Sequence, residues 1–185
     1  SLRCGFTPIE RLAGGRAAVF HTGTLAFAWA TPTDDPRAGV TARFREIAEL
    51  LSTALRSLGV DAQVGEIPGE YCPGAYSIHA EHRAKLVGVG QRLVRGAAHV
   101  GGVISVTDSE RLRSVLEPVY RELGLHWLPS TAGAIDDFVP DITVDTVRDA
   151  VIAAFSERFE LTPATLPTAI VQMGLELAPG HISPA

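Results

Sequence analysis

Two glycine-bearing segments of the chain carry residue types that could contact an anionic or carbonyl-bearing ligand. In the first, adjacent Gly14 and Gly15 lie between Arg11 and Arg16, and His21 follows. Adjacent glycines let the backbone approach a ligand closely and expose amide donors to it. The flanking guanidinium groups could bind a phosphate or carboxylate in bidentate fashion. The same pattern also fits an ordinary turn between strands, with His21 as a strand-end residue.

The second segment holds the one lysine of the chain, Lys85, just before a bend that contains Gly88 and Gln91. Every other residue among the 16 basic ones is arginine, and the chain has no asparagine, a composition that indicates a GC-rich coding source. A lysine retained in such a composition indicates a need for a compact, titratable ammonium. Partial burial would strengthen its pull on a carbonyl oxygen. The alternative is an edge-strand lysine that opposes aggregation.

Cys72 precedes Lys85 by thirteen residues, in a loop rich in proline and glycine. A nearby ammonium would favour the thiolate, which is the reactive form of cysteine. The alternative is an inert buried thiol. Cys72 and Cys4 are the two cysteines of the chain, too few for a disulfide framework.

The composition bounds the class of protein. With 185 residues the chain is long enough for one domain with its own core, so a single domain over 1–185 is expected. A net charge of −5 disfavours a broad nucleic-acid surface, because phosphate binding needs clustered positive charge. Every long apolar stretch is interrupted before it could cross a bilayer, and no signal peptide is recognisable. A cytoplasmic protein without a metal site, a membrane partner or a nucleic-acid partner is therefore expected.

The hydrophobic pattern predicts both strands and helices. Strands are predicted over residues 9–12, 17–20, 25–30, 60–67, 77–79, 84–87 and 101–106, with 88–92 as a connection. Helices are predicted over 41–58, from 108 or 109 onward with Pro118 as an obstacle, and over 143–159. A further short helix between Pro167 and Pro179 would use Ile170, Met173 and Leu177.

Because strands come both adjacent and separated by helices, the expected fold class is α+β, with a mixed β-sheet flanked by helices. The first strand starts so early that we expect the natural protein to have further chain before Ser1.

Together the two segments resemble motifs of the lipoate-protein ligase A and octanoyltransferase family. The segment from Arg11 to Leu25 resembles Arg-x-x-Gly-Gly-x-x-x-Val-x-His, and the segment from Lys85 to Arg92 resembles Lys-aliphatic-x-Gly-x-small-Gln. Both occur in the expected order with a predicted helix between them, and the resemblance runs from about residue 9 to 106. It implies a catalytic domain of the biotin/lipoate protein ligase kind, similar to class II aminoacyl-tRNA synthetases.

The resemblance also implies roles for individual residues. Lys85 matches the motif lysine that touches the carbonyl of the lipoyl or octanoyl group. Cys72 lies where the cysteine-dependent octanoyltransferases have their nucleophile, although those enzymes have a sequence of the type Cys-Phe-x-x-Pro-Ser and this chain has Cys-Pro-Gly-Ala-Tyr. Substrate-binding roles are implied for Arg11, Gly14, Gly15, Arg16, His21, Gly88 and Gln91.

The resulting hypothesis is that Lys85 favours the Cys72 thiolate, which takes an octanoyl group from octanoyl-acyl carrier protein and passes it to a lysine of a lipoyl domain or of the glycine-cleavage carrier protein. This reaction needs no cofactor. The first alternative is an ATP-dependent lipoate-protein ligase that forms lipoyl-AMP from lipoate and requires ATP and Mg²⁺. The second is a non-catalytic acyl-binding module of the same fold. Arg83, Arg92 and Arg95 are candidates for a basic docking patch near Lys85.

Overall fold

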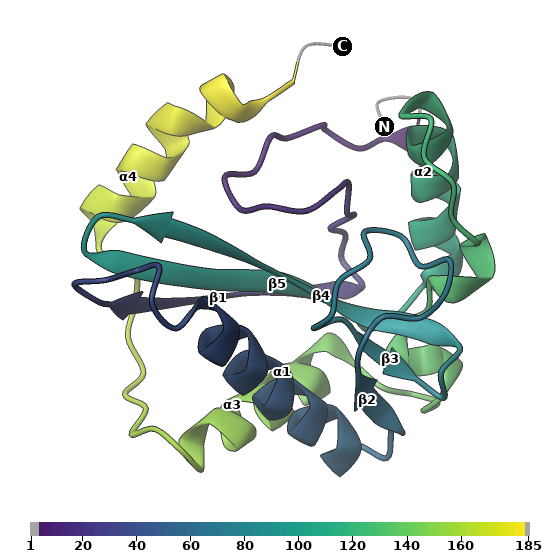
Figure 1. The fold of residues 1–185 in the computed structure, drawn as a ribbon, viewed down its shortest axis with the longest axis horizontal. Helices are drawn as coiled ribbons and strands as arrows, with labels where there is room; N and C mark the ends of the chain where they lie inside the picture. Colours follow the sequence, from purple (N-terminus) through teal and green to yellow (C-terminus); the bar gives the residue numbers. More distant parts are fainter. Residues whose placement is uncertain (1–3, 184–185) are drawn as a thin grey trace.

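The computed structural model describes residues 4–183 and places a five-stranded sheet at the centre of the molecule (Figure 1). The strand order is β1-β5-β4-β3-β2. The strands are β1 (Thr24–Pro32), β2 (Ala62–Val64), β3 (Ile78–Ala80), β4 (Ala84–Val94) and β5 (Ala97–Ser105). The helices are α1 (Val40–Ser57), α2 (Ser109–Glu122), α3 (Val144–Ser156) and α4 (Thr168–Leu177), with short 3-10 turns η2 (Pro129–Thr131), η3 (Ile135–Asp137) and η4 (Ala178–His181).

The α+β class is confirmed, but the sheet differs from the mixed sheet expected. All four pairs of neighbouring strands are antiparallel. The α1 connection carries the chain from one edge strand, β1, to the opposite edge strand, β2, and the chain then returns through β3, β4 and β5 by antiparallel pairing. Within residues 4–183 the parallel contact is a single isolated bridge between Lys85 and Ala132.

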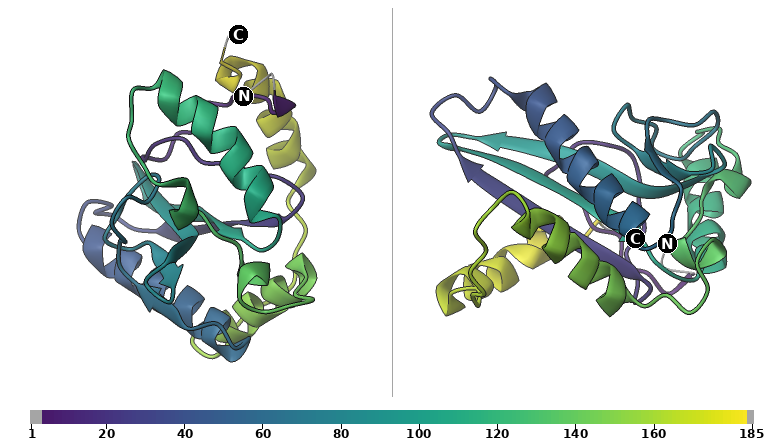
Figure 2. Two further views of the ribbon diagram at one scale, coloured as in Figure 1. Left: turned by 90° about the vertical axis from the view of Figure 1, so that its right-hand side faces the viewer. Right: turned by 90° about the horizontal axis from the view of Figure 1, so that it is seen from below.

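One face of the sheet is covered by α1 and α3 (Figures 1 and 2). Successive side chains of a strand point to opposite faces, and Leu25, Phe27 and Trp29 of β1 belong to the core beneath these two helices. The periodicity predicted for residues 41–58 explains α1, whose Ile47, Leu51 and Leu55 are fully buried. A second buried cluster joins α2 to the loops before and after it, with Leu112, Leu116 and Tyr120 from the helix.

The opposite face of the sheet has small residues where the first face has large ones. Ala26 of β1 lies beside Val103 of β5, which lies beside Gly88 of β4; in the next row Ala28, Gly101 and Gly90 are neighbours. Residues 9–20 cross over this face as a loop (Figure 1). The sheet therefore has one filled face and one hollow face.

Several predicted elements take other forms. Residues 17–20 form no strand, because they leave the sheet and Val19 packs into the cluster beside α2. Residues 9–12 form no strand beyond one bridge between Ile9 and Ile182. Residues 88–92 are not a connection but the middle of β4. Glycine is unfavourable inside a strand, and its presence there marks a place where something approaches the backbone closely.

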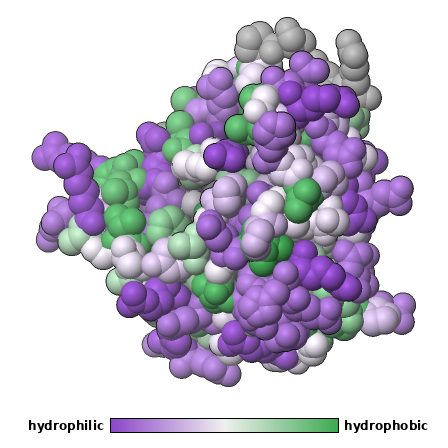
Figure 3. Space-filling model, turned by 45° about the vertical axis from the view of Figure 1, so that its right-hand side comes forward, coloured by the Kyte–Doolittle hydropathy of each residue, from purple (hydrophilic) through white to green (hydrophobic). Residues whose placement is uncertain are grey.

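The short helix predicted between Pro167 and Pro179 is confirmed as α4. Its apolar residues Ile170, Met173 and Leu177 are each more than half exposed. Pro118 lies inside α2 without ending it. No helix among residues 4–183 is long and apolar enough to cross a membrane. Hydrophilic side chains dominate the face seen in Figure 3, with hydrophobic side chains in separate patches.

Candidate active site

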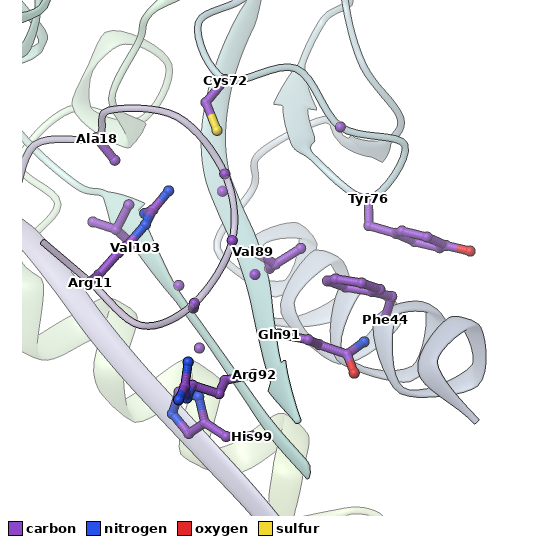
Figure 4. A pocket seen from close by; sticks show the side chains of 18 of the residues that line it. Arg11, Ala18, Phe44, Cys72, Tyr76, Val89, Gln91, Arg92, His99 and Val103 are labelled. Atoms are coloured by element: carbon purple, nitrogen blue, oxygen red, sulfur yellow. The ribbon is translucent and has the colours of Figure 1, made fainter. Parts of the chain in front are cut away.

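A cavity of about 1050 Å³ runs along β4 (Figure 4). It lies on the hollow face of the sheet and extends around the edge of β4, which β3 leaves uncovered after Val87, to α1. Its floor includes Gly88 and Gly90 of β4 and Gly101 and Gly102 of β5. A methyl group added at Gly90 would lie 3.1 Å from the Gly14 carbonyl oxygen, so the loop over the sheet packs directly on the strand backbone. The glycines of the second motif thus make room for the first motif. This close approach explains why both motifs need glycine.

The Gly14-Gly15 loop forms one wall of the cavity. Gly15 has φ +106°, a backbone conformation that favours glycine. Arg11 donates from Nη2 to the Arg16 carbonyl oxygen at 2.6 Å, which closes the loop on itself. A methyl group added at Gly15 would lie 2.6 Å from Arg11 Nη2 and 3.1 Å from Cys72 Sγ, so the guanidinium and the sulfur are neighbours across this glycine.

Cys72 lies at one end of the cavity, opposite the glycine loop (Figure 4). Its sulfur accepts a hydrogen bond from the Arg16 backbone N–H at 3.0 Å. Its backbone φ is +44°, which is rare for a residue with a side chain and is worth a functional explanation. The thiol is free and partly exposed. A partly exposed thiol beside an amide donor and a guanidinium has the surroundings expected of a reactive cysteine.

Lys85 is almost completely buried, with 1% of its side chain exposed. Its ammonium donates to Glu70 Oε1 at 3.0 Å, to the Tyr71 carbonyl oxygen at 3.1 Å and to the Cys72 carbonyl oxygen at 2.6 Å. It also lies 5.0 Å from the centre of the Tyr71 ring. The ammonium is therefore held at the backbone of Cys72, and the Cys72 sulfur is not among its hydrogen-bond acceptors.

The remaining wall of the cavity comes from α1 and the loop before β3. The rings of Phe44 and Tyr76 are stacked, 5.2 Å apart and nearly parallel (Figure 4). Gln91 donates to the Val40 carbonyl oxygen at 2.7 Å and accepts from Arg43 at 3.2 Å, which ties β4 to the start of α1. Gln91 thus lines the cavity and fixes its edge.

The structure gathers most of the predicted site residues around one cavity. Arg11, Gly14, Gly15, Cys72, Lys85, Gly88 and Gln91 all line it. Arg16 does not line it but contributes its backbone N–H and carbonyl to the neighbouring residues.

His21 also lies away from the cavity lining. Its Nδ1 accepts from the Gly23 N–H at 3.1 Å, and its Nε2 is buried without a partner. Burial lowers the pKa of His21, against an opposing effect of Asp108. His21 is thus not among the residues that line the cavity, and its role in substrate binding stays a prediction.

The predicted docking patch is divided by the fold. Arg83 precedes β4 and Arg95 follows it, so eleven strand residues, about 35 Å of extended chain, separate them. Arg83 packs over the Phe138 ring and lies 3.5 Å from Glu81, whereas Arg92 lines the cavity. A patch that includes all three arginines is therefore wrong.

Sequence reasoning missed Glu70, which the fold places beside Lys85. Its one signal was an acidic residue two positions before Cys72 in a loop of prolines and glycines, and this pattern is also typical of solvent-exposed turns. It missed Phe44 and Tyr76 as well, because a helix residue and a loop residue 32 positions apart give no common signal. Tyr120 was also missed; its hydroxyl donates to the Ala17 carbonyl oxygen at 3.1 Å, and burial raises its pKa to about 12.

Known proteins resemble this chain at the levels of family, sequence and structure. A family model described as Lipoyl protein ligase A/B catalytic domain matches residues 3–156. The chain is 30% identical over 138 residues to an Octanoyl-[GcvH]:protein N-octanoyltransferase of Geobacillus kaustophilus, covering 75% of this chain and 48% of that protein. It is 29% identical over 164 residues to lipoate-protein ligase A subunit 1 of Thermoplasma acidophilum, covering 85% of this chain and 61% of that protein.

Two solved structures have similar folds. A crystal structure of lipoate-protein ligase A bound with ATP has a TM-score of 0.76 and 25% identity, covering 96% of this chain and 70% of that chain. A lipoate protein ligase of T. acidophilum with bound lipoic acid has a TM-score of 0.75 and 26% identity, covering 95% and 69%. The chain therefore spans only part of its relatives, from about half to under two thirds of the two curated proteins.

Proposed function

Since the chain belongs to the lipoyl protein ligase A/B catalytic-domain family, we propose that it transfers an octanoyl or lipoyl group to a protein lysine through a thioester on Cys72. The observation that carries the proposal is the position of the Cys72 thiol at one end of a cavity that is floored by glycine and lined mainly by apolar residues. Such a cavity suits a short acyl chain, and the thiol stands where the reactive carbonyl of that chain would arrive.

With octanoyl-acyl carrier protein as donor, the first half of the reaction exchanges one thioester for another. The Cys72 thiolate attacks the donor's carbonyl carbon, the donor's carbon–sulfur bond breaks, and the carrier leaves as a thiolate. The Arg16 N–H at 3.0 Å and the neighbouring Arg11 guanidinium favour the attacking thiolate. Lys85 contributes an ammonium on the carbonyl side, where negative charge develops on oxygen.

The second half releases the acyl group to the acceptor. The ε-amine of a protein lysine attacks the Cys72 thioester, an amide forms, and the departing sulfur takes up the proton that the amine loses. The names of the octanoyltransferase relatives give octanoyl-GcvH as donor and a protein as acceptor. We therefore infer that a GcvH-like carrier serves as donor, rather than as acceptor only, alongside octanoyl-acyl carrier protein, and that a lipoyl domain is the acceptor. A carrier that holds the octanoyl group on a lysine holds it as an amide. With that donor the carbon–nitrogen bond breaks, and the lysine amine leaves with the proton that the Cys72 thiol gives up.

Intact mass spectrometry after mixing the protein with an octanoyl-carrier donor, without ATP, tests the proposal. We expect the wild type to gain an octanoyl mass and Cys72→Ser to gain none. Adding a lipoyl domain should remove the added mass from the wild type. An unmodified wild type that binds free octanoate without turnover would instead make the chain an acyl-binding module.

An ATP-dependent ligase is a second candidate, because one similar structure holds ATP and a similar T. acidophilum protein is named a lipoate-protein ligase. Arg11 and Arg92 line the cavity, and guanidinium groups are suited to phosphate. In this reaction Cys72 would be dispensable. Lipoylation of an acceptor by Cys72→Ser supplied with lipoate, ATP and Mg²⁺ supports this candidate, and its absence supports the transferase.

A further inference from the structure

Glu70 is a buried carboxylate that the acyl-transfer steps above do not use. It is 3% exposed and accepts four hydrogen bonds. Its Oε2 accepts from the Ile67 N–H at 3.0 Å, and its Oε1 accepts from the Gly74 N–H at 3.2 Å, Ser77 Oγ at 2.6 Å and Lys85 Nζ at 3.0 Å. Three of these donors belong to residues 67–77, the Cys72 loop: Ile67 and Ser77 lie at its two ends, and Gly74 lies between Cys72 and Ser77. One carboxylate therefore closes this loop and joins it to β4.

The Lys85 ammonium has no free proton in this arrangement. An ammonium has three N–H donors, and Glu70, the Tyr71 carbonyl and the Cys72 carbonyl use all three. Neither side chain of the Glu70–Lys85 pair is exposed by more than 1%, so bulk water does not contact the two charged groups. A substrate carbonyl can reach the ammonium only by replacing one of its present acceptors.

The acceptor that yields is a backbone carbonyl of the Cys72 loop. Glu70 is fixed by three further donors, whereas Cys72 lines the cavity at a φ of +44°. If the Cys72 carbonyl gives way to the carbonyl of the acyl group, Glu70 is the contact that keeps the ammonium in place during the exchange. A buried ammonium without that carboxylate would be an unpaired charge.

We propose that Glu70 is a positioning residue that acts through Lys85, holding the ammonium and the Cys72 loop in register for acyl transfer. The inference rests on the transferase function proposed above. It separates two tasks at the site: Arg11 and the Arg16 amide serve the sulfur, and the Glu70–Lys85 pair serves the carbonyl oxygen.

The test is a double-mutant cycle on the rate at which Cys72 takes up the octanoyl group. The variants are Glu70→Gln, Lys85→Met and the two combined, with Glu70→Asp as the conservative variant and Glu66→Gln as control. Glu66 is an exposed carboxylate in the preceding segment. Because a misplacement of about 1 Å can cost ~10²-fold in rate, we expect Glu70→Gln to lower kcat by about that factor with KM nearly unchanged. Glu70→Asp should keep part of the wild-type rate, and the control Glu66→Gln should react at the wild-type rate.

In the Lys85→Met background, adding Glu70→Gln should lower the rate no further. An equal loss in both backgrounds would show a general structural role and overturn the inference, as would a wild-type rate in Glu70→Gln. Circular dichroism and gel filtration verify that Glu70→Gln is folded before rates are compared. If it is not folded, the rate of the double variant, which has neither buried charge, is compared with that of Lys85→Met. A wild type that takes up no octanoyl group overturns the proposed function first, and this inference with it.

Discussion

Along β1, β5 and β4, the two faces of the central five-stranded sheet carry side chains of opposite size. On the face beneath α1 and α3, Leu25, Phe27 and Trp29 of β1 contribute to a core in which Leu51 and Ile104 are fully buried. On the other face the neighbouring positions are alanine and glycine except for Val103, and a cavity takes the place of a core. The filled face stabilises the fold through packed side chains. The face with small side chains leaves volume for a ligand and lacks that packing.

This difference between the faces predicts which substitutions lower stability and which lower the reaction rate. Removing side-chain atoms from the filled face should lower stability and leave the reaction intact. Adding atoms to the hollow face should do the reverse. Four substitutions or conditions test this separation, from the largest expected effect to the smallest.

Leu51→Ala on α1 should lower the free energy of unfolding by about 2–5 kcal/mol, because it leaves a cavity in a fully buried core. Urea unfolding followed by circular dichroism measures the change. Leu175→Ala on α4 is the matched control, since Leu175 is 64% exposed and should change stability by less than about 0.5 kcal/mol. Equal losses in the two variants would contradict the placement of Leu51 in the core and of Leu175 outside it.

Gly90→Val on β4 should lower acyl uptake by about 10²-fold, because its side chain would push against the Gly14 carbonyl and displace the glycine loop from the reactive carbonyl. Stability should change far less than in Leu51→Ala. Gly174→Val on α4, where added atoms meet open space, is the control and should react at the wild-type rate. The octanoyl mass gained per minute is the measurement, and a reactive Gly90→Val would place the acyl group elsewhere.

Phe44→Ala should widen the cavity at the Phe44–Tyr76 stack. The loss of this aromatic pair costs about 0.5–1.5 kcal/mol beyond its buried area. We expect longer acyl donors, such as dodecanoyl thioesters, to gain relative to octanoyl by up to about tenfold in kcat/KM. Competition between the two donors, resolved by intact mass, gives the ratio directly. An unchanged ratio would mean that this wall does not limit acyl length.

The smallest expected effect is on pH-dependent stability. Burial lowers the pKa of His79 on β3, with nearby His82 acting in the same direction and Glu70 and Asp61 opposing it. As pH falls below the usual 6.5, the unfolded chain takes up a proton before the folded chain does, so stability decreases. Tm measured from pH 7.5 to 5.5 should therefore fall, and His79→Gln should flatten the curve. His126→Gln, at an exposed site, should leave the curve as in the wild type.

The fold was readable where one residue period dominates. The apolar residues of α1 recur at helical spacing, so its bounds were predicted to within one residue, and the starts of α2 and α3 were predicted equally well. The end of α3 was placed three residues too late, and the start of β5 four residues too late. The middle of β4 was misread because Gly88 and Gly90 imitate a bend; their local preference is overridden by pairing with β5 on one side and by the approach of the glycine loop. Residues 17–20 were misread because an apolar run gives no sign of which partner buries it.

The sequence by itself identified the groups from which the proposed site is built: one lysine in the whole chain, a cysteine ahead of it and two glycine motifs in order are local facts of composition and spacing. The tertiary structure decided how those groups meet. Only the fold puts the Glu70 carboxylate on Lys85, the Arg16 amide on the Cys72 sulfur and the stacked rings of Phe44 and Tyr76 on the cavity wall. The physical reason is that hydrogen bonds and burial act over a few ångströms, and residues far apart in sequence come within that distance only after the sheet has formed.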